Sequence, residues 1–318
     1  MTLKRTPKIV MVGSAMVDLV TRVPRLPVGG ETLVGSSFDI GFGGKGSNQA
    51  VMAARLGAQV SVVAKLGRDV FGEQVLENYR KQSIDTTHVS FVEGSSGVAP
   101  IMVDEESGQN IVVIVPGANN HLSVKDVEAA AAVIEKADIL IGQLEIPVQT
   151  TLAAFELAQR HGVTTLLNPA PAAELPDALW HATDTVVPNE IEAAQLSNLN
   201  VANAEDAIKA ARALQHRGPQ QVVVTLGSQG AVVLDADDNA HYLEARKVKA
   251  VDTTGAGDAF VGSLAYFLGL DYSLADAAQR AGAVATLSVQ KAGTQTSYPS
   301  AEEVAEAGAT KGSRVGKK

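Results

Sequence analysis

The segment Asp252–Phe260, with the sequence DTTGAGDAF, says more about the fold and the chemistry of this chain than any other stretch. Two glycines surround Ala256, and Asp258 follows them at once. The apolar run that comes next, AFVGSLAYFLGL, predicts a helix. Glycines before a helix let backbone N–H groups point at one spot, where the helix dipole adds partial positive charge. The segment therefore predicts a helix start that binds an anion.

The position of Asp258 beside this anion hole indicates catalysis. A carboxylate next to a bound anion would repel it, so it is a poor structural choice. It suits a reaction in which Asp258 removes a proton from a hydroxyl while the anion hole stabilises a transferring phosphoryl group. The alternative is an ordinary helix start, with Asp in the first turn and glycines for packing.

The composition bounds the class of protein. The chain has 318 residues, of which 46% are hydrophobic and 19% charged, as expected for a globular protein with a sizeable core. The net charge of −9 argues against a general nucleic-acid binder. The sequence contains no cysteine, which excludes disulfides, zinc–thiolate sites and a cysteine nucleophile. The six histidines show no pair with metal-ligand spacing.

The sequence predicts neither export nor membrane insertion. The first residues, MTLKRTPKIVMVGS, lack the long apolar region of a signal peptide. No apolar run approaches the roughly 18 residues that a membrane-spanning helix needs. We therefore expect a cytoplasmic protein without a membrane partner.

Strand-like and helix-like runs alternate along the chain. Helices are predicted at 47–58 and 71–82, and strands at 8–14, 60–67, 138–145, 163–170 and 221–227. Continuous apolar strands separated by helices predict a mostly parallel sheet covered on both faces, within a single α/β domain spanning 1–318. Ligands bind such sheets at the carboxyl ends of the strands. Glu145, Asn168 and Gly227 fall at those ends.

Two segments interrupt this alternation and predict a small β lid. Residues 15–42 and 88–116 combine turn residues with alternating apolar positions, and the second is typical of a hairpin with its turn at Glu105–Gln109. We expect both to form short antiparallel strands outside the main sheet. Residues 308–318 are polar and basic, and we expect them to be disordered.

The stretch GFGGKGSNQA predicts a glycine loop that opens a helix. Its Gly41, Gly43 and Gly46 match G-x-G-x-x-G, but a dinucleotide fingerprint would follow the first strand directly. It is not a Walker A loop, because Lys45 is followed by glycine. We expect Lys45 and Asn48 to face a small polar ligand that approaches the backbone closely. The alternative is a flexible turn with a helix cap.

Three further polar positions each allow two interpretations. Asp18 follows the first strand and either contacts a ligand or only forms a turn. Asn189 with Glu192 three residues later fits a capping box, but Glu192 could instead hold water around magnesium. The glycine-containing stretch TLGSQG at 225–230 suits either a nucleotide-lining loop or a tight hairpin.

Together these residues resemble the ribokinase branch of the PfkB carbohydrate kinase family, from about residue 8 to 307. The stretches GGKGSNQA and DTTGAGDAFVGS match the two signatures of that family. The blocks QLE, LNPAPA, PNE, VVTLGSQG and KAGTQTSYPS occur in the family's order. The resemblance implies a ribokinase-like α/β fold and an ATP-dependent kinase for the terminal hydroxyl of a sugar. Asp258 would be the base, and the amides of Gly255, Ala256 and Gly257 would form the anion hole.

The resemblance also implies the remaining site residues and partners. The sugar would contact Asp18, Gly44, Lys45, Asn48 and Glu145. ATP would lie along Asn189, Thr225, Gly227, Ser228 and Gly230, with Glu192 near Mg²⁺. A potassium ion beside the anion hole would be held by Asp252, Thr254, Ser288, Lys291, Gly293 and Ser297, several of them through backbone carbonyls. The lid would form a homodimer.

One position, Met16, departs from the ribokinase pattern, which usually has Asn there. The block GSAMVDL, with SSGVAPI and GTQTSYPS, is more similar to the deoxyribokinase subgroup. Asn can hydrogen-bond a sugar hydroxyl, whereas the Met thioether is only a weak acceptor, so Met beside C2 suits a methylene. We therefore expect a kinase that makes the 5-phosphate of 2-deoxy-D-ribose. The alternative functions are a ribokinase, a nucleoside kinase and a non-catalytic sugar-binding regulator. The alternative for Met16 is that its side chain only packs under the lid.

Overall fold

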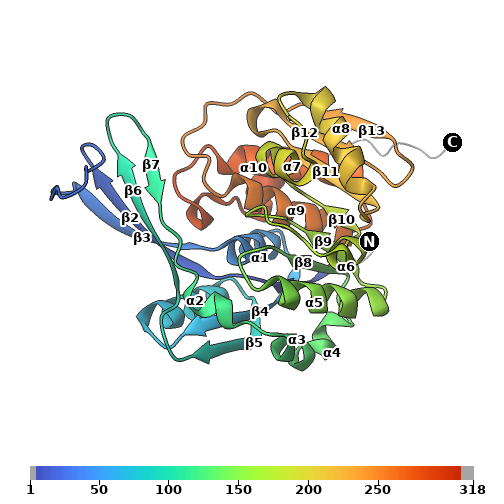
Figure 1. The fold of residues 1–318 in the computed structure, drawn as a ribbon, viewed down its shortest axis with the longest axis horizontal. Helices are drawn as coiled ribbons and strands as arrows, with labels where there is room; N and C mark the ends of the chain where they lie inside the picture. The colour runs from blue at the N-terminus through green and yellow to red at the C-terminus, as the bar shows by residue number, and fades with distance from the viewer. Residues whose placement is uncertain (1–4, 309–318) are drawn as a thin grey trace.

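The computed structural model describes residues 5–308, so most of the tail predicted at 308–318 lies outside the described residues. The described chain forms two sheets (Figure 1), the larger in the order β13-β12-β11-β10-β9-β8-β1-β4-β5. Neighbours from β11 to β5 are parallel, and β12 and β13 add an antiparallel edge. These strands are β1 (Lys8–Val12), β4 (Gln59–Gly67), β5 (Asp85–Val92), β8 (Ile139–Gly142), β9 (Thr164–Leu167), β10 (Thr185–Val186), β11 (Gln221–Thr225), β12 (Ala231–Leu234) and β13 (Ala240–Leu243). The predicted α/β class with a mostly parallel sheet is confirmed.

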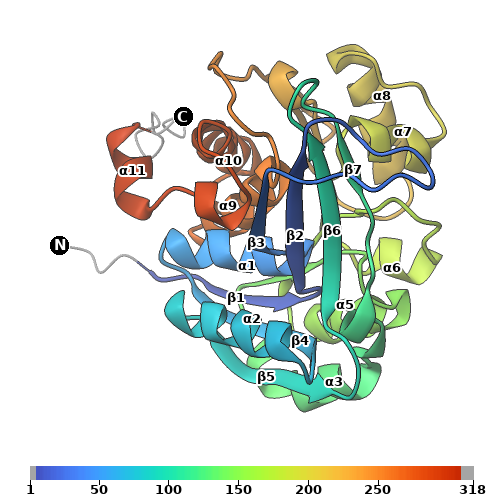
Figure 2. The same ribbon diagram turned by 90° about the vertical axis from the view of Figure 1, so that its left-hand side faces the viewer.

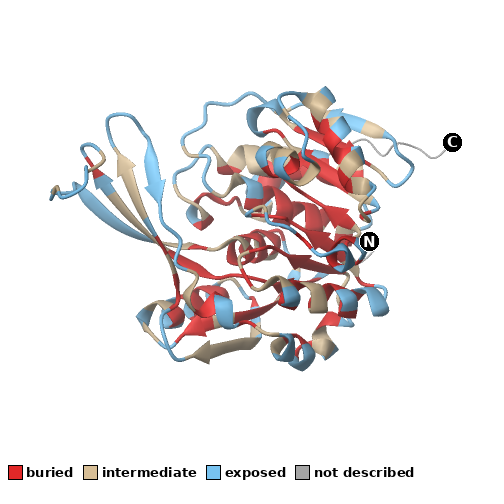
Figure 3. Ribbon diagram, viewed as in Figure 1, coloured by how far each residue is buried: buried red, intermediate tan, exposed pale blue. Residues whose placement is uncertain are grey.

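Helices cover both faces of this sheet, because its central strands are apolar on both sides (Figure 3). The helices are α1 (Lys45–Arg55), α2 (Val70–Lys81), α3 (Val124–Ala129), α4 (Ala131–Ile134), α5 (Val148–Arg160), α6 (Asp177–His181), α7 (Glu190–Ser197), α8 (Ala204–Gln215), α9 (Ala256–Gly269), α10 (Leu274–Ser288) and α11 (Ala301–Glu306). Within the described residues there are also three short 3₁₀ helices, η1 (Gly117–His121), η2 (Gly227–Gln229) and η3 (Gln295–Ser297). None of the helices within 5–308 is long and apolar enough to cross a membrane.

Alternation along β1 divides the core into two layers. Ile9 and Met11 pack into a cluster with α1, α2, α9 and α10, while Val10 and Val12 pack into a second cluster with α3 to α8. This follows from the period of two along a strand. Strand β1 is thereby packed between two layers of helices, which fixes the position of its carboxyl end.

The smaller sheet contains β2 (Met16–Val23), β3 (Ser37–Gly43), β6 (Gly97–Asp104) and β7 (Asn110–Val112), in the order β3-β2-β6-β7. It projects from the left of the body in Figure 1 and faces the viewer in Figure 2. The β6–β7 hairpin turns where the sequence predicts, since the Asp104 N–H donates to the Gln109 carbonyl over 2.9 Å.

Two expectations for the lid need correction. Residues 88–92 belong to β5 of the main sheet, because their backbone extends the ladder with β4 as far as the Gly67–Val92 pair. The lid is also not purely antiparallel, since β2 and β6 run parallel with Met16 opposite Gly97. Between β2 and β6 the chain forms β4 and β5 of the main sheet. It then returns to the lid, so β2 and β6 both enter the lid from the same end.

Candidate active site

A helix, α9, begins where the sequence predicts one, directly after Gly255. Gly255 is the N-cap and has a φ of 76°, in the left-handed region that favours glycine. A Cβ on Gly255 would lie 2.5 Å from Cγ2 of Thr294 and 2.8 Å from the hydroxyl of Tyr298, so only glycine fits. The Tyr298 hydroxyl donates to the Gly255 carbonyl over 3.0 Å. The turn is therefore held from the outside by the loop that precedes α11.

This helix start leaves backbone donors for an anion. The N–H of Ala256, which the sequence analysis expects in the anion hole, instead donates to the carbonyl of Thr253 at 3.2 Å. The N–H groups of Gly257 and Asp258 belong to the first turn, where no intrahelical acceptor exists. A Cβ on Gly257 would meet nothing within 4 Å, so the space above it is open. These groups and the helix dipole make the site electrostatically suitable for a phosphoryl group.

Asp258 lies in this first turn, and its side chain is held at both oxygens. The residue is 8% exposed. Oδ2 accepts from Nδ2 of Asn48, and Oδ1 accepts from Nε2 of Gln49, each at 2.9 Å. Gly262 allows α1 to approach α9 this closely, because a Cβ there would lie 2.4 Å from the Gln49 carbonyl oxygen. The carboxylate is therefore fixed in orientation before any substrate binds.

Glu145 follows β8 and lies at the same edge of the sheet. Its Oε2 accepts from the Ser14 hydroxyl at 2.5 Å and from the Lys45 N–H at 2.9 Å. Burial raises the pKa of Glu145, and the charge of Asp258 adds to this, although the hydrogen bond from Ser14 and the charge of Lys45 oppose it. Glu145 thus joins the end of β1 to the start of α1.

Asp18 and Lys45 complete a charged cluster around Asp258. A Cβ on Gly43 would lie 2.3 Å from Oδ1 of Asp18, so the glycine makes room for this carboxylate. Burial, together with the charges of Glu145 and Asp258, raises the pKa of Asp18 to about 6. Burial opposes the charge of Lys45, but the carboxylates around it raise its pKa overall. A polar ligand with several hydroxyls would find both donors and acceptors here.

Met16 begins β2 and is only 3% exposed. It lies two residues before Asp18, so both side chains project from the same face of the strand. Asn119 fixes the preceding residue by accepting from the Ala15 N–H at 2.9 Å and donating to its carbonyl at 3.0 Å. Among the described residues, Met16 belongs to neither of the two main hydrophobic clusters. Its face of β2 is therefore that of the charged cluster.

The predicted nucleotide residues gather at the ends of β10 and β11. Asn189 forms a parallel bridge with Thr225. The capping box is present, since Glu192 Oε2 accepts from the Asn189 N–H at 2.9 Å and Asn189 Oδ1 accepts from the Glu192 N–H at 2.8 Å. Burial raises the pKa of Glu192, and the Asn189 hydrogen bond opposes this.

The turn that follows β11 forms a tight hairpin with β12, and part of its backbone is open to solvent. Gly227 has a φ of 53° with nothing within 4 Å of its Cβ position, and Ser228 is exposed. Gly230 has a φ of 107°, and a Cβ there would lie 2.0 Å from the Leu243 carbonyl oxygen. Gly230 has no room for a side chain, whereas the left-handed backbone at Gly227 only favours glycine, and the turn leaves room for a ligand above Gly227.

The residues predicted around potassium lie on two loops that Asp252 joins. Its carboxylate accepts from the N–H groups of Thr254 and Gly293, each at 2.9 Å. Partial burial opposes its charge, but these hydrogen bonds lower the pKa of Asp252 overall. The Lys291 amine pairs with Glu303 at 2.5 Å, so its side chain points away from the loops and only its backbone could serve as a ligand.

The oxygen donors of these loops fit an alkali cation. The hydroxyls of Ser288 and Ser297 donate to the carbonyls of Ala285 and Thr294, at 2.9 Å and 2.7 Å, and keep their own lone pairs. Within residues 5–308, no three His, Asp or Glu side chains are grouped so that they could hold a metal ion. The donors here are therefore hydroxyl and backbone oxygens beside one carboxylate.

Residues 6–301 match the family model of the pfkB family carbohydrate kinases. The chain belongs to this family. It is 46% identical to the ribokinase of Mus musculus over 296 residues, which are 92% of this chain and 91% of that protein. It is 41% identical to the deoxyribokinase of Salmonella typhi over 297 residues, 93% of this chain and 96% of that protein.

Solved structures agree with this assignment. The ribokinase of Arabidopsis thaliana complexed with ribose and ATP superposes with a TM-score of 0.88 at 29% identity, covering 95% of this chain and 99% of that chain. The protein is therefore a carbohydrate kinase of the ribokinase type, and use of ATP is expected of this family.

The kinase site includes residues that the sequence reasoning did not single out. Gln49 and Gln143 form buried hydrogen bonds within it, and Ser14 and Asn119 fix its edges. Gln295 contacts Asn48 from the loop after α10. Gln49, Gln143 and Gln295 lie inside the quoted stretches GGKGSNQA, QLE and KAGTQTSYPS, and membership of these stretches was the available signal.

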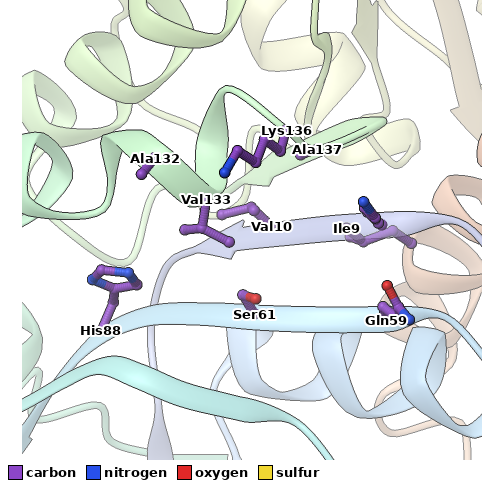
Figure 4. A pocket seen from close by; sticks show the side chains of 10 residues that line it. Ile9, Val10, Gln59, Ser61, His88, Ala132, Val133, Lys136 and Ala137 are labelled. Atoms are coloured by element: carbon purple, nitrogen blue, oxygen red, sulfur yellow. The ribbon is translucent and has the colours of Figure 1, made fainter.

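A separate hollow lies away from this site (Figure 4). Its volume is about 390 Å³, and it lies by the amino ends of β1 and β4, where Figure 4 shows His88 and Lys136 at its rim. It shares no residue with the charged cluster around Asp258. The polar side chains around Asp258 lie at the carboxyl ends of the strands instead.

Proposed function

We propose that this kinase transfers the γ-phosphoryl group of ATP to the 5-hydroxyl of 2-deoxy-D-ribose. Support comes from Asp258, which lies in the first turn of α9 with both carboxylate oxygens held by Asn48 and Gln49. A carboxylate so fixed beside open helix N–H groups can accept a proton while those groups bind a phosphoryl anion.

The proposed reaction is an in-line displacement. Asp258 takes the proton of the 5-hydroxyl, the hydroxyl oxygen bonds to the γ-phosphorus, and the bond from that phosphorus to the bridging oxygen of ADP breaks. The N–H groups of Gly257 and Asp258 stabilise charge on the transferring group, with Gly255 fixing their direction. Positioning supplies much of the rate in phosphoryl transfer, so the fixed carboxylate matters as much as its basicity.

The sugar would lie among Asp18, Lys45, Asn48 and Glu145, with the backbone of Gly44 beside it. Deoxyribose is proposed because Met16, on the same face of β2 as Asp18, offers no strong hydrogen-bonding atom to a 2-hydroxyl. Ribose is the second candidate, and it is favoured by the 46% identity to a protein named ribokinase.

The nucleotide would lie along Asn189, Thr225 and the turn of Gly227, Ser228 and Gly230. Magnesium keeps several waters and binds phosphate oxygens, so it would arrive with ATP, and Glu192 would contact it through water. The dependence on ATP agrees with a cytoplasmic location.

We propose that potassium activates the enzyme by fixing the loops of Asp252 and Gly293, which lie next to Gly255. When bound, the ion would supply positive charge beside the anion hole. The rate should be higher in potassium than in sodium at equal ionic strength. Equal rates in potassium, sodium and a bulky organic cation would remove this proposal without affecting the kinase assignment.

The lid is proposed to form a homodimer, because its strands and loops carry large apolar side chains that face solvent. Val34 is 86% exposed and Phe38 58% exposed, and Ile40 and Ile114 add to this surface. Replacing Phe38 and Ile40 by serine should halve the mass measured by light scattering. A wild-type enzyme that is monomeric at assay concentration would contradict the proposal.

The substrate is tested by following ATP consumption with 2-deoxy-D-ribose, D-ribose, D-fructose and adenosine. We expect the highest kcat/KM for 2-deoxy-D-ribose, and phosphorus NMR of the product should show a 5-phosphate. A preference for ribose would favour the second candidate. A preference for adenosine would indicate a nucleoside kinase, and no turnover with any of them would favour a non-catalytic regulator.

A further inference from the structure

Two chains of amide side chains end on Asp258, and each chain ends on a different oxygen. The first chain is short. Gln143 Nε2 donates to Gln49 Oε1 at 2.7 Å, and Gln49 Nε2 donates to Asp258 Oδ1 at 2.9 Å. The second hydrogen of Gln49 Nε2 goes to Asn168 Oδ1 at 3.0 Å. Gln49 is 0% exposed, so a sugar cannot touch it.

The second chain comes from a different part of the molecule. Asn78 Nδ2 donates to Gln295 Oε1 at 2.9 Å, Gln295 Nε2 donates to Asn48 Oδ1 at 2.9 Å, and Asn48 Nδ2 donates to Asp258 Oδ2 at 2.9 Å. The remaining hydrogen of Gln295 Nε2 reaches Ser47 Oγ at 3.0 Å. The residues of this chain lie on α2, η3, α1 and α9.

The carboxylate fixes the direction of both chains. An ionised carboxylate only accepts hydrogen bonds, so the atoms of Asn48 and Gln49 that face Asp258 must be the amide nitrogens. Their oxygens then face Gln295 and Gln143, which must donate. Turning over any one amide would place oxygen against oxygen in a buried site. Both chains are therefore polarised toward Asp258 along their whole length.

We propose that Gln49 and Gln295 are positioning residues that keep the Asp258 carboxylate ionised and aimed at the sugar hydroxyl. This inference rests on the proposed role of Asp258 as base. Gln49 acts by direct donation, and Gln295 acts through Asn48. Gln295 also lies two residues after Gly293, whose N–H donates to Asp252, so the second chain connects the proposed cation loops to the base.

The two residues differ in what their loss should do. Removing Gln49 takes one donor from Asp258 and lets the carboxylate rotate about its bond to Cβ. Removing Gln295 frees the Asn48 amide, which also belongs to the proposed sugar site. We therefore expect Gln49 to affect kcat almost alone, and Gln295 to affect both kcat and the KM for the sugar.

The experiment compares Gln49→Met, Gln49→Glu and Gln295→Met with wild type across pH, using saturating ATP and varied deoxyribose and ribose. Both changes at Gln49 nearly conserve its volume. The matched control is Gln215→Met at the end of α8. It removes an amide that donates to the backbone carbonyls of Gln220 and Asp235. Thermal unfolding of every variant sets an assay temperature at which all are folded.

We expect kcat to fall roughly 10- to 100-fold in Gln49→Met, because small misplacements of a reacting group carry costs of this order. Loss of a donor disfavours the charged form of a carboxylate, so the acid limb of the pH–rate profile should move to higher pH than in wild type. The carboxylates of Asp18, Glu145 and Glu192, the Lys45 amine and the Tyr298 hydroxyl also face Asp258, but none changes between variants.

Several results would overturn the proposal. An unchanged kcat in both Gln49 variants would do so, as would a fall in kcat without movement of the acid limb, which indicates only a packing role. The control should match wild type in kcat and acid limb. If Asp258→Asn abolishes turnover while the Gln49 variants behave as wild type, the positioning inference fails alone. If Asp258→Asn remains active, the proposed base itself fails.

Discussion

The proposed sugar side and the proposed nucleotide side of this site are built differently. On the sugar side, both carboxylate oxygens of Asp258 and the Oε2 of Glu145 accept hydrogen bonds from buried groups. On the nucleotide side, Gly227 and Ser228 lie exposed on a turn. The sugar side is therefore preorganised around a few side chains, while the nucleotide side offers mainly backbone. Substitutions should thus have large and specific effects on the sugar side and smaller ones on the nucleotide side.

The largest effect is expected from Asp258→Asn. A positioned general base contributes roughly 10²–10⁴-fold to the rate, so kcat should fall by about that factor while nucleotide binding is retained. The measurement is kcat by ADP release and the ATP Kd by calorimetry. The matched control is Asp276→Asn, which changes the first-turn Asp of the neighbouring helix α10. A variant that keeps more than about a tenth of wild-type kcat would show that Asp258 is not the base.

The two sides also differ in how many of their residues could be predicted from the sequence. Alternating strands and helices predict the parallel sheet, and the sheet predicts that Glu145 and Asn168 lie at its carboxyl edge. Gln295 could not be found in this way, because its contact with Asn48 spans 247 positions of sequence. A glutamine has no pattern of its own until its partners are in place.

The errors in the lid have the same origin. Pairing partners are set by tertiary structure, and the apolar alternation of 85–92 suits a strand in either sheet. The structure gives that segment to β4, because α2 returns the chain beside it. The capping box at Asn189, in contrast, is local and was predicted from three residues of spacing.

The second largest effect is a gain of stability in Asp18→Asn. Asp18 has a pKa of about 6 in the fold against 3.8 unfolded, so its ionised form is disfavoured by folding above pH 6. The variant should be more stable at pH 8 by on the order of 2–3 kcal/mol at most. This gain should fade as the pH falls through 6 toward 4, where the folded carboxyl is already protonated.

The test measures urea unfolding of Asp18→Asn at pH 8 and pH 5, together with the KM for the sugar. Exposed Asp39 of β3 supplies the control, Asp39→Asn. We expect the variant to have a higher KM for the sugar as well as a higher stability, because residues that bind a substrate often destabilise the free protein. An equal gain in the free energy of unfolding at both pH values, or a loss at pH 8, would show that ionised Asp18 does not destabilise the fold.

The third effect concerns Met16 and divides the two candidate sugars. Ribose should bury its 2-hydroxyl against a side chain that cannot pair it, at a cost of roughly 1–3 kcal/mol. This corresponds to a preference for deoxyribose of about 5- to 150-fold in kcat/KM, which is not absolute because apolar pockets reject an added hydroxyl only by about 10². Met16→Asn should move the ratio toward ribose, mainly through the efficiency with ribose.

The control for Met16→Asn is Met16→Leu, which keeps an apolar side chain of similar size. It should retain the preference of the wild type. A wild-type enzyme that prefers ribose, or an unchanged ratio in Met16→Asn, would remove Met16 as the discriminating residue. The chain would then be a ribokinase, and the chemistry at Asp258 would stand.

The smallest effect tests the nucleotide side through Asn189, which both caps α7 and faces the proposed ATP path. Asn189→Ala removes the cap and should cost about 1 kcal/mol of stability in urea unfolding. Asn189→Asp keeps a good cap and adds negative charge, so its stability should stay near wild type while its KM for ATP rises through repulsion of the phosphates. If both variants raised the KM for ATP equally, the effect would come from the helix start. If neither did, Asn189 would be a structural cap, and the nucleotide side would depend on backbone alone.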